Sequence, residues 1–325
     1  MFEPSDAILQ ARHLCKQFPV AKGKTLTAVR DANLDVYYGK TLGIVGESGC
    51  GKSTLARMIA HMETPTSGEI ILNGENIVYL QGEALRQHRQ HMQMVFQDPL
   101  ASFHPKMKII DILTEPLMNF GRLVRGGREQ KARELLEMVG LPDSMLYRYP
   151  HSMSGGQRQR IGIARALSLE PEILICDEAT SALDVSIQDT IISLLVKLQR
   201  EKGISILFIC HDIALIQAFA HQIAVMYLGH IVEVLPGESV AKGALHPYTQ
   251  ALVGALFSVH MNPAVKLQSI EGEAPSPLEL PVGCPFQNRC PHCMEQCKQE
   301  LPELIQYAPG HFAACHYTAN GGKPV

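Results

Sequence analysis

The sequence contains no tryptophan, only 6% of its residues are aromatic, and its formal net charge over 325 residues is only −3. Because proteins that bind nucleic acid through their overall charge are basic, these values argue against a nucleic-acid partner. Apolar runs are short, and none reaches the roughly 18 residues of a membrane-spanning helix. The first residues also lack the basic stretch and apolar core of a secretion signal. We therefore expect a cytosolic chain, unless a partner holds it at a membrane.

The residues that are present predict a soluble α/β protein. The sequence is 46% hydrophobic and 19% charged, which is typical of globular chains and sufficient for a large core. Strand-like apolar runs alternate with helix-like segments in its second half, so we expect a mainly parallel sheet covered by helices. The predicted elements are strands 172–177, 204–210 and 223–228 and helices 156–168, 186–201 and 213–220.

Residues 46–54 read G-E-S-G-C-G-K-S-T, which is the G-x-x-x-x-G-K-[ST] form of a phosphate-binding loop. An apolar run, 41–45, precedes the loop, and a good helix former, 55–60, follows it. In such a loop the glycines free the backbone N–H groups to surround an anion, the lysine contacts the β- and γ-phosphates, and the serine hydroxyl joins the Mg²⁺ shell. We expect the nucleotide to be bound by Gly46, Ser48, Gly49, Cys50, Gly51, Lys52, Ser53 and Thr54.

Polar residues follow three apolar runs, namely the short run 92–96 and the runs of the predicted strands 172–177 and 204–210. Asp177 and Glu178 end the apolar run 173–176, Gln97 follows Phe96, and His211 follows Cys210. Ligands bind beyond the carboxyl ends of strands in open parallel sheets, so these side chains should converge with Lys52 on one edge. Asp177 is suited to hold Mg²⁺, and Glu178 is suited to polarise a water molecule beside the γ-phosphate.

A second glycine-rich helix start occurs at Ser154-Gly155-Gly156-Gln157, where Ser154 is suited to cap the helix. Two interpretations are open from these four residues alone. They form either a second anion site at a helix N-terminus or simply a well-capped helix.

Taken together, these motifs resemble those of the ABC-type ATPase subunits in order and approximate spacing. The resemblance covers about residues 8–255 and includes the acidic strand end 173–178, residues 181–184 after it, and the signature 154–158. It implies a P-loop NTPase fold of the ABC nucleotide-binding type, with Mg²⁺ and ATP as cofactor and substrate. A helical subdomain at about 98–170 would be inserted in this α/β domain of residues 1–255.

The resemblance also implies roles for individual residues. Glu178 would be the general base, His211 the switch that contacts the γ-phosphate, and Phe18 the aromatic that stacks on adenine. Gln97 would complete the Mg²⁺ shell formed with Ser53 and Asp177 and would link it to a membrane partner. Such ATPases work as head-to-tail pairs, in which residues 154–157 of one subunit close on the γ-phosphate held by Lys52 of the other.

The composition changes after Leu235, since eleven of the twenty prolines lie from Pro236 onward. We expect residues 256–325 to form a separate, small, loop-rich extension that contains cysteines. Residues 246–252, 272–277, 283–286 and 289–290 look like the C-terminal region of oligopeptide and dipeptide importer ATPases. Relatives that serve uptake of nickel or antimicrobial peptides are an alternative, and a soluble, non-transport ABC ATPase is a more distant one.

The importer resemblance implies a set of partners and a location. The partners would be a second ATPase subunit, identical or homologous, two transmembrane permease subunits, and an extracytoplasmic peptide-binding protein. The chain would then be a peripheral protein on the cytoplasmic face of the inner membrane, where it couples ATP hydrolysis to uptake.

Five of the nine cysteines lie together near the C-terminus, at positions 284, 290, 293, 297 and 315. In a reducing compartment such a group indicates metal binding more than disulfides. In similar subunits, a pattern like that of Cys284, Cys290, Cys297 and Cys315 is tied to a [4Fe–4S] cluster. Tetrahedral zinc and no metal at all are the open alternatives.

Overall fold

The computed structural model of the chain describes residues 6–124, 126–181, 183–255 and 272–322. These residues belong to two compact units. The first takes the described residues of 1–37, 41–78 and 210–325, and the second takes those of 38–40 and 79–209. Within the described ranges no helix is both long and apolar enough to cross a membrane.

An antiparallel sheet of four strands belongs to the first unit, in the order β2-β1-β4-β5. Its strands are β1 (Ala7–Pro19), β2 (Thr25–Tyr37), β4 (Ser67–Leu72) and β5 (Glu75–Asn76). Alternate residues of β2, namely Ala32, Leu34 and Val36, are buried, while the residues between them are more exposed. This period of two shows that one face of the sheet packs against the core.

The first unit also contains five strands in the order β11-β12-β10-β9-β3. All five residues of β3 (Thr41–Val45) are buried, and β3 pairs in parallel with β9 (Gln222–Tyr227). The next strand, β10 (His230–Pro236), runs antiparallel to β9. The helices of this part are α1 (Lys52–Ile59), α8 (Ile213–Gln217), α9 (Val240–Gly243) and α10 (Pro247–Gly254), and its 3₁₀ turns are η2 (Ala21–Gly23) and η5 (Gly237–Ser239).

The C-terminal residues extend the sheet of the first unit. The amino-acid composition of this segment does not indicate these strands. Strand β12 (His311–Ala313) pairs with β10, and β11 (Ile305–Ala308) pairs with β12. Glu233 of β10 is fully buried and accepts a hydrogen bond from Nε2 of His311 at 2.8 Å. Loops, the turn η6 (Gln287–Arg289) and the short helices α11 (Glu295–Gln299) and α12 (His316–Ala319) complete the tail. The predicted domain boundary at residue 255 adjoins residues 256–271, which lie outside the described residues.

Three parallel strands form the sheet of the second unit, in the order β8-β7-β6. They are β6 (Met92–Val95), β7 (Ile173–Asp177) and β8 (Ser205–Ile209). Helix α7 (Val185–Lys202) connects β7 to β8; Asp184 caps its start, and Gly203 ends it in the left-handed conformation. The strands and helices predicted between residues 156 and 228 are confirmed, with shifts of a few residues at their ends.

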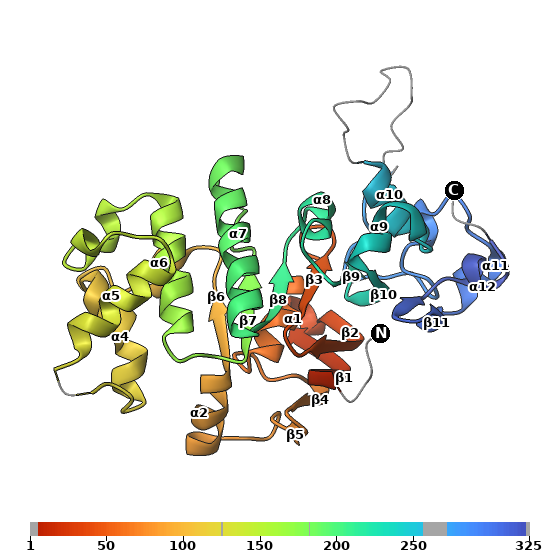
Figure 1. Ribbon diagram of the computed structural model, residues 1–325. Coiled ribbons are helices and arrows are strands. Elements are labelled where there is room, and N and C mark those ends of the chain that lie inside the picture. The colour runs from red at the N-terminus through yellow and green to blue at the C-terminus, as the bar shows by residue number, and fades with distance from the viewer. Residues whose placement is uncertain (1–5, 125, 182, 256–271, 323–325) are drawn as a thin grey trace. The chain divides into compact units, whose positions relative to one another are not determined.

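Between β6 and β7 the described chain is helical (Figure 1). Ala132, Leu135, Leu136 and Val139 are all buried, at the i, i+3, i+4, i+7 spacing of one helix face. Helices α4, α5 and α6 pack on one another. The elements of this region are α3 (Pro99–Ser102), α4 (Ile109–Asn119), α5 (Arg128–Met138), η3 (Asp143–Met145), η4 (Pro150–Ser152) and α6 (Gly155–Leu167), and α2 (Gly82–His91) comes just before β6.

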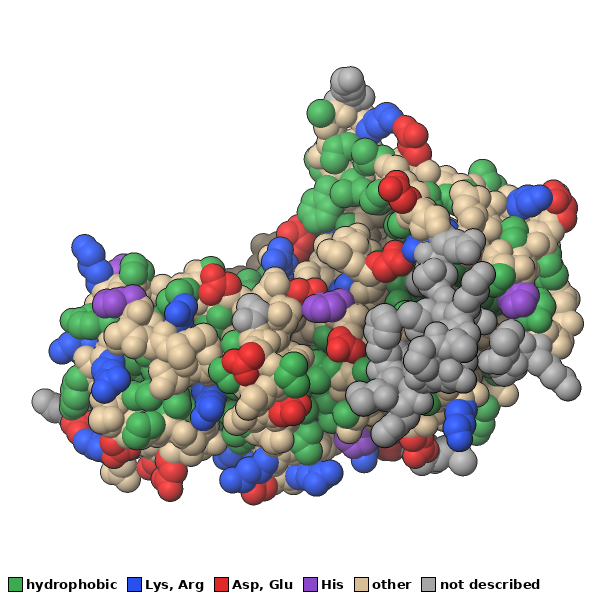
Figure 2. Space-filling view, turned by 90° about the horizontal axis from the view of Figure 1, so that it is seen from above, with side chains coloured by type: hydrophobic (Ala, Val, Ile, Leu, Met, Phe, Trp, Pro, Cys, Tyr) green, Lys and Arg blue, Asp and Glu red, His purple; other side chains and the backbone are tan. Residues whose placement is uncertain are grey.

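Charged side chains of both signs are interspersed on the face seen in Figure 2. This agrees with the nearly balanced count of 29 basic and 32 acidic residues. Such a surface gives little long-range attraction to a polyanion.

Candidate functional site

The predicted phosphate-binding loop connects β3 to α1, in the order strand, loop, helix that such a loop requires. Gly51, the last residue before α1, has φ of +109°. A Cβ atom there would lie 2.2 Å from the carbonyl oxygen of Ala28 on β2. Only glycine therefore allows this close approach of the loop to β2.

Lys52 is buried and turned toward its own loop. Its Nζ donates hydrogen bonds to the carbonyl oxygens of Gly46 at 2.8 Å and Glu47 at 2.9 Å. Burial raises the pKa of the neighbouring Cys50 thiol, and the charge of Lys52 only partly offsets this effect. Cys50 is thus a neutral, buried part of the loop, and the ammonium group of Lys52 is the charged group that the loop itself places at the start of α1.

Aromatic residues and the tail hold Glu47, the second residue of the loop. The backbone N–H of Glu47 donates to the hydroxyl of Tyr248 at 2.9 Å. Arg289 of the tail donates from Nη1 and Nη2 to the two carboxylate oxygens of Glu47, each at 3.0 Å. Burial by itself lowers the pKa of Arg289, but its hydrogen bonds to Glu47 and to Tyr227 outweigh burial and raise that pKa above its ordinary value.

Two further predicted residues lie in the first unit. His211 is exposed, and the preceding N–H, that of Cys210, donates to the carbonyl of Ile44 on β3 at 3.1 Å. His211 therefore leaves the sheet beside the strand that leads into the phosphate loop. Phe18 of β1 is partly exposed, and the ammonium group of Lys16 lies 5.0 Å from the centre of its ring. Its ring thus forms a cation–π contact on a strand surface.

The acidic residues lie in the second unit. Asp177 is the last residue of β7 and is buried, and Glu178 follows it with φ of +48°, an uncommon conformation for a residue other than glycine. The N–H of Glu178 donates to the carbonyl of Ile209 on β8 at 3.0 Å, which holds this conformation in place. Backbone strain of this kind is typical of functional positions.

Gln97 comes next to these acids because β6 and β7 are parallel neighbours, with Val95 opposite Cys176. Nε2 of Gln97 donates to Oγ of Ser181 at 3.1 Å, and this hydroxyl donates to the carbonyl of Glu178 at 3.0 Å. The sequence motifs do not predict an individual role for Ser181. The structure thus joins Gln97 to the backbone of Glu178 through one serine.

Ser154 caps α6, and its side chain forms a capping box with Gln157. The N–H of Gln157 donates to Oγ of Ser154 at 3.3 Å, and the N–H of Ser154 donates to Oε1 of Gln157 at 3.0 Å. Ser154 and Gly155 are exposed, while a Cβ at Gly156 would lie 2.5 Å from Ile187. The exposed helix start remains available to an anion or a partner.

Of the residues 181–184 noted after the acids, Ala182 lies outside the described residues.

The predicted convergence of these groups combines residues of both units. Lys52 and His211 lie in the first unit, and Gln97, Asp177 and Glu178 lie in the second. In the second unit, Ser181 joins Gln97 to Glu178 at the carboxyl ends of the parallel strands β6 and β7. Their meeting in one site stays a prediction.

The thiols of the tail are neighbours. Cys284, Cys297 and Cys315 are buried, and Cys290 and Cys293 are partly exposed. Burial raises the pKa of Cys284 to about 12, with smaller contributions in the same direction from Cys297, Cys290 and Cys315. The donor set suits a four-thiolate cluster chemically. As they are arranged, however, no three His, Cys, Asp or Glu side chains among the described residues form a group that could hold a metal ion.

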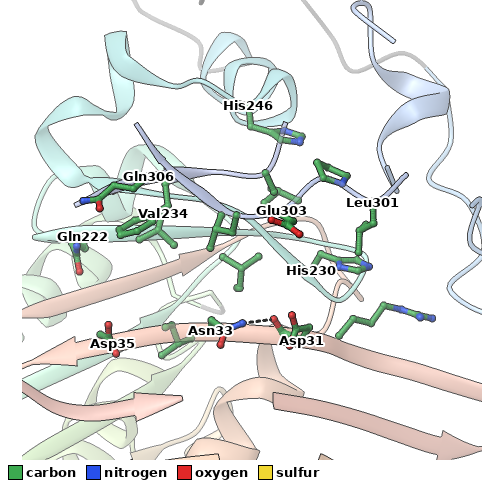
Figure 3. A pocket seen from close by; sticks show the side chains of 18 of the residues that line it. Asp31, Asn33, Asp35, Gln222, His230, Val234, His246, Leu301, Glu303 and Gln306 are labelled. Atoms are coloured by element: carbon green, nitrogen blue, oxygen red, sulfur yellow. Dashed lines mark hydrogen bonds between the residues drawn. The ribbon is translucent and has the colours of Figure 1, made fainter. Parts of the chain in front are cut away.

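A cavity of about 700 Å³ lies elsewhere in the first unit, between β2 and the tail (Figure 3). Its lining includes Asp31 and Asp35 of β2, Glu303 of the tail, and two histidines, His230 and His246. Burial lowers the pKa of both histidines to about 4, so they are neutral at neutral pH. None of the residues predicted to bind nucleotide is among those that line this cavity.

Comparison with known families gives two matches along the chain. Residues 29–181 match the family described as ABC transporter, and residues 232–297 match the family described as oligopeptide/dipeptide transporter, C-terminal region. The first match contains the phosphate loop, the capping box at Ser154 and the two acids at the end of β7. The second contains most of strand β10, Tyr248, Arg289 and four of the tail cysteines.

Known relatives resemble the chain over nearly its whole length. A probable peptide ABC transporter ATP-binding protein of Sinorhizobium fredii is 46% identical over 97% of this chain and 91% of its own. An oligopeptide transport ATP-binding protein of Bacillus subtilis is 44% identical over 96% and 97%. A di/tripeptide transport ATP-binding protein of Pseudomonas aeruginosa is 42% identical over 96% and 98%.

Solved structures resemble the chain as well. One is a dimeric ATP-binding cassette in a post-hydrolysis state with bound ADP and phosphate, with a TM-score of 0.66 and 29% identity. It covers 71% of this chain and 99% of its own. The fold is thus that of an ABC ATPase cassette.

Proposed function

Because the chain belongs to the ABC transporter ATP-binding proteins, we propose that it is the ATP-hydrolysing subunit of an importer of oligopeptides or dipeptides. The observation that carries this proposal is the presence of both matched regions in one chain. The first region contains the phosphate-binding loop, Gln97, residues 154–157 and the acids Asp177 and Glu178. The second is shared with proteins named for peptide transport.

In the first unit, residues 46–54 bind the phosphates of ATP. The start of α1 and the buried ammonium group of Lys52 supply positive charge, and the hydroxyl of Ser53 is a ligand for Mg²⁺. Phe18 stacks on the adenine ring, and its partial exposure supports that role. His211 senses the γ-phosphate, and the hydrogen bond from the preceding N–H, that of Cys210, to Ile44 of β3 supports that placement.

In the second unit, Asp177 and Gln97 complete the Mg²⁺ shell, and Glu178 accepts a proton from the attacking water molecule. A carboxylate at the end of a buried strand is the usual holder of Mg²⁺ in enzymes with a phosphate loop. The constrained backbone of Glu178 supports a role that needs exact placement of its side chain.

Hydrolysis then requires two copies of this domain. Residues 154–157 of one ATPase subunit close on the γ-phosphate bound to the other, and the exposed, capped start of α6 supports this role. The second subunit is identical or homologous. Two permease subunits and an extracytoplasmic peptide-binding protein complete the importer, and the chain lies against the cytoplasmic face of the membrane.

Peptide uptake by the cell is the direct test. Deletion of the gene should abolish uptake of peptides of a defined length range. The intact gene should restore it, and a Lys52→Ala variant made in equal amount should not. Unchanged peptide uptake in the deletion strain, with loss of nickel or antimicrobial-peptide uptake instead, would assign a different cargo. Co-purification only with ribosomes would remove the transport role.

For the tail, we propose that Cys284, Cys290, Cys297 and Cys315 become the ligands of a [4Fe–4S] cluster when it is supplied. The burial of Cys284, Cys297 and Cys315 supports this assignment, although the four thiols are not arranged as metal ligands in the structure. Iron and acid-labile sulfide should be found in protein purified without oxygen. Folded protein that contains zinc, or no metal, would exclude the cluster.

A further inference from the structure

The tail reaches the phosphate loop through one arginine. Arg289 forms a two-pronged ion pair with Glu47 across 242 residues of sequence, with both N–O distances at 3.0 Å. The arginine side chain is only 8% exposed and the glutamate side chain 31%. A bidentate pair with this degree of burial is stronger and more directional than an ion pair in solvent.

Glu47 is held at all three of its polar groups. Its N–H donates to Tyr248, its carbonyl accepts from Lys52 at 2.9 Å, and its carboxylate is paired with Arg289. The second of these contacts involves the lysine that contacts the phosphates. If Glu47 moves, its carbonyl oxygen, to which Lys52 donates a hydrogen bond, therefore moves with it.

Arg289 is itself fixed by an aromatic cluster that joins the tail to β9 and α10. The ring of Phe286 lies edge-on to Tyr227 at 5.3 Å and tilted to Tyr248 at 5.4 Å, and it is fully buried. The N–H of Arg289 donates to the carbonyl of Phe286 at 3.0 Å, and Nη1 of Arg289 donates to the hydroxyl of Tyr227 at 3.2 Å. The buried aromatic cluster thus holds Arg289 of the tail in contact with the phosphate-binding loop.

We propose that Arg289 is a positioning residue for the phosphate-binding loop, and that the tail acts on ATP binding through the Arg289–Glu47 ion pair. A carboxylate within a loop that surrounds phosphates repels them unless a cation neutralises it. The pair removes this repulsion and holds the loop in its binding conformation before ATP arrives. The proposal rests on the assignment of residues 46–54 as the phosphate site.

The test is a nucleotide titration of the full-length chain with a fluorescent N-methylanthraniloyl ATP. Arg289→Gln should raise the dissociation constant by about tenfold, the usual size of a lost charge-assisted contact. Arg289→Lys should recover part of the affinity, because lysine restores the positive charge but cannot form the two parallel hydrogen bonds of a guanidinium group. In steady-state hydrolysis KM should rise with kcat unchanged, as expected when an interaction that stabilises the bound ground state and the transition state equally is lost.

A double-mutant cycle separates positioning from general damage to the fold. Glu47→Gln removes the charge that Arg289 neutralises, so the double variant Glu47→Gln/Arg289→Gln should bind no more weakly than Arg289→Gln. Additive losses would overturn the proposal. So would unchanged affinity in a folded Arg289→Gln variant. If Arg289→Gln does not fold, the test depends on Glu47→Gln alone, which changes the more exposed partner of the ion pair. Unchanged ATP affinity of Glu47→Gln would then overturn the proposal.

The chain offers a matched control, because a second ion pair also links the tail to the rest of the first unit. Lys24 Nζ lies 2.6 Å from Oε1 of Glu279, and both side chains are exposed. Lys24→Gln should leave the dissociation constant within about twofold, since exposed pairs contribute little. Lys52→Ala tests the phosphate site separately. If Lys52→Ala binds ATP normally, the assignment of the loop fails, whatever Arg289 does.

Discussion

Nε2 of Gln97 donates a hydrogen bond to Oγ of Ser181 at 3.1 Å, and Ser181 in turn donates to the carbonyl of Glu178 at 3.0 Å. Gln97 follows β6 and Glu178 follows β7, so the serine spans the ends of two neighbouring strands. In the proposed function Gln97 helps to hold Mg²⁺ and Glu178 is the base. Ser181 thus connects a residue proposed to hold the metal with the residue proposed to act on water.

Replacing Ser181 by alanine should lower kcat for ATP hydrolysis by about fivefold, the rate equivalent of one neutral hydrogen bond. KM for ATP should not change, because Ser181 has no assigned contact with the nucleotide. Thr190→Ala is the matched control, since its hydroxyl only donates to the carbonyl of Ser186 within the exposed part of α7. Equal effects of the two variants on kcat would contradict the proposed link.

Glu178→Gln should lower the rate of ATP hydrolysis by about 100-fold or more, which is the usual contribution of a general base. The amide keeps the shape of the side chain but cannot accept the proton, so ATP binding should persist. Phosphate release measures the first effect. Gel filtration with ATP and Mg²⁺ should show a stable dimer of the variant. Undiminished turnover would remove Glu178 from the role of base.

Gly51→Ala should lower the free energy of unfolding by about 3 kcal/mol or more, because the new Cβ meets the Ala28 carbonyl oxygen and the loop must move. Gly49→Ala is the control within the same loop. Gly49 has φ of +78°, but a Cβ there has no neighbour within 4 Å. Gly49→Ala should therefore lower the free energy of unfolding only by the backbone strain, which is about 1–2 kcal/mol. Urea unfolding compares the two, and equal losses would show that the contact with β2 is not what requires glycine.

Acid should destabilise the first unit through His246. Burial lowers the pKa of His246 from 6.5 to about 4, and the charge of Glu233 only partly opposes this. Because the folded pKa lies below the unfolded one, the contribution to stability is complete above pH 6.5. It is lost as the pH falls toward 4, by about 3 kcal/mol in total.

The variant His246→Asn isolates this effect. Nδ1 of His246 caps α10 by accepting from the N–H of Tyr248 at 3.0 Å, and asparagine is also a good capping residue. The free energy of unfolding of His246→Asn should therefore fall less between pH 6.5 and 4 than that of the unmodified protein. The exposed His151 provides the control, since His151→Asn should keep the full pH dependence. An identical slope in all three proteins would remove His246 as the source.

Much of the fold was predictable because its signals are local. The burial of the apolar stripe from Ala132 to Val139 and of the apolar run 173–176 in β7 is predictable from the spacing of apolar residues alone. The tail was less predictable. Strand β12 is only three residues long, and its pairing with β10 depends on the buried Glu233 meeting His311, two residues 78 positions apart.

The candidate site likewise has a part that the sequence predicts and a part that only the structure reveals. By itself the sequence determined the phosphate loop, the acids after β7 and the cap at Ser154, because each motif requires particular residue types at fixed short spacing. Only the tertiary structure decided that Glu47 pairs with Arg289 and that Gln97 reaches Glu178 through Ser181. A charged residue in a glycine-rich loop carries no sign of its partner, because an ion pair needs proximity in space and is indifferent to distance along the chain.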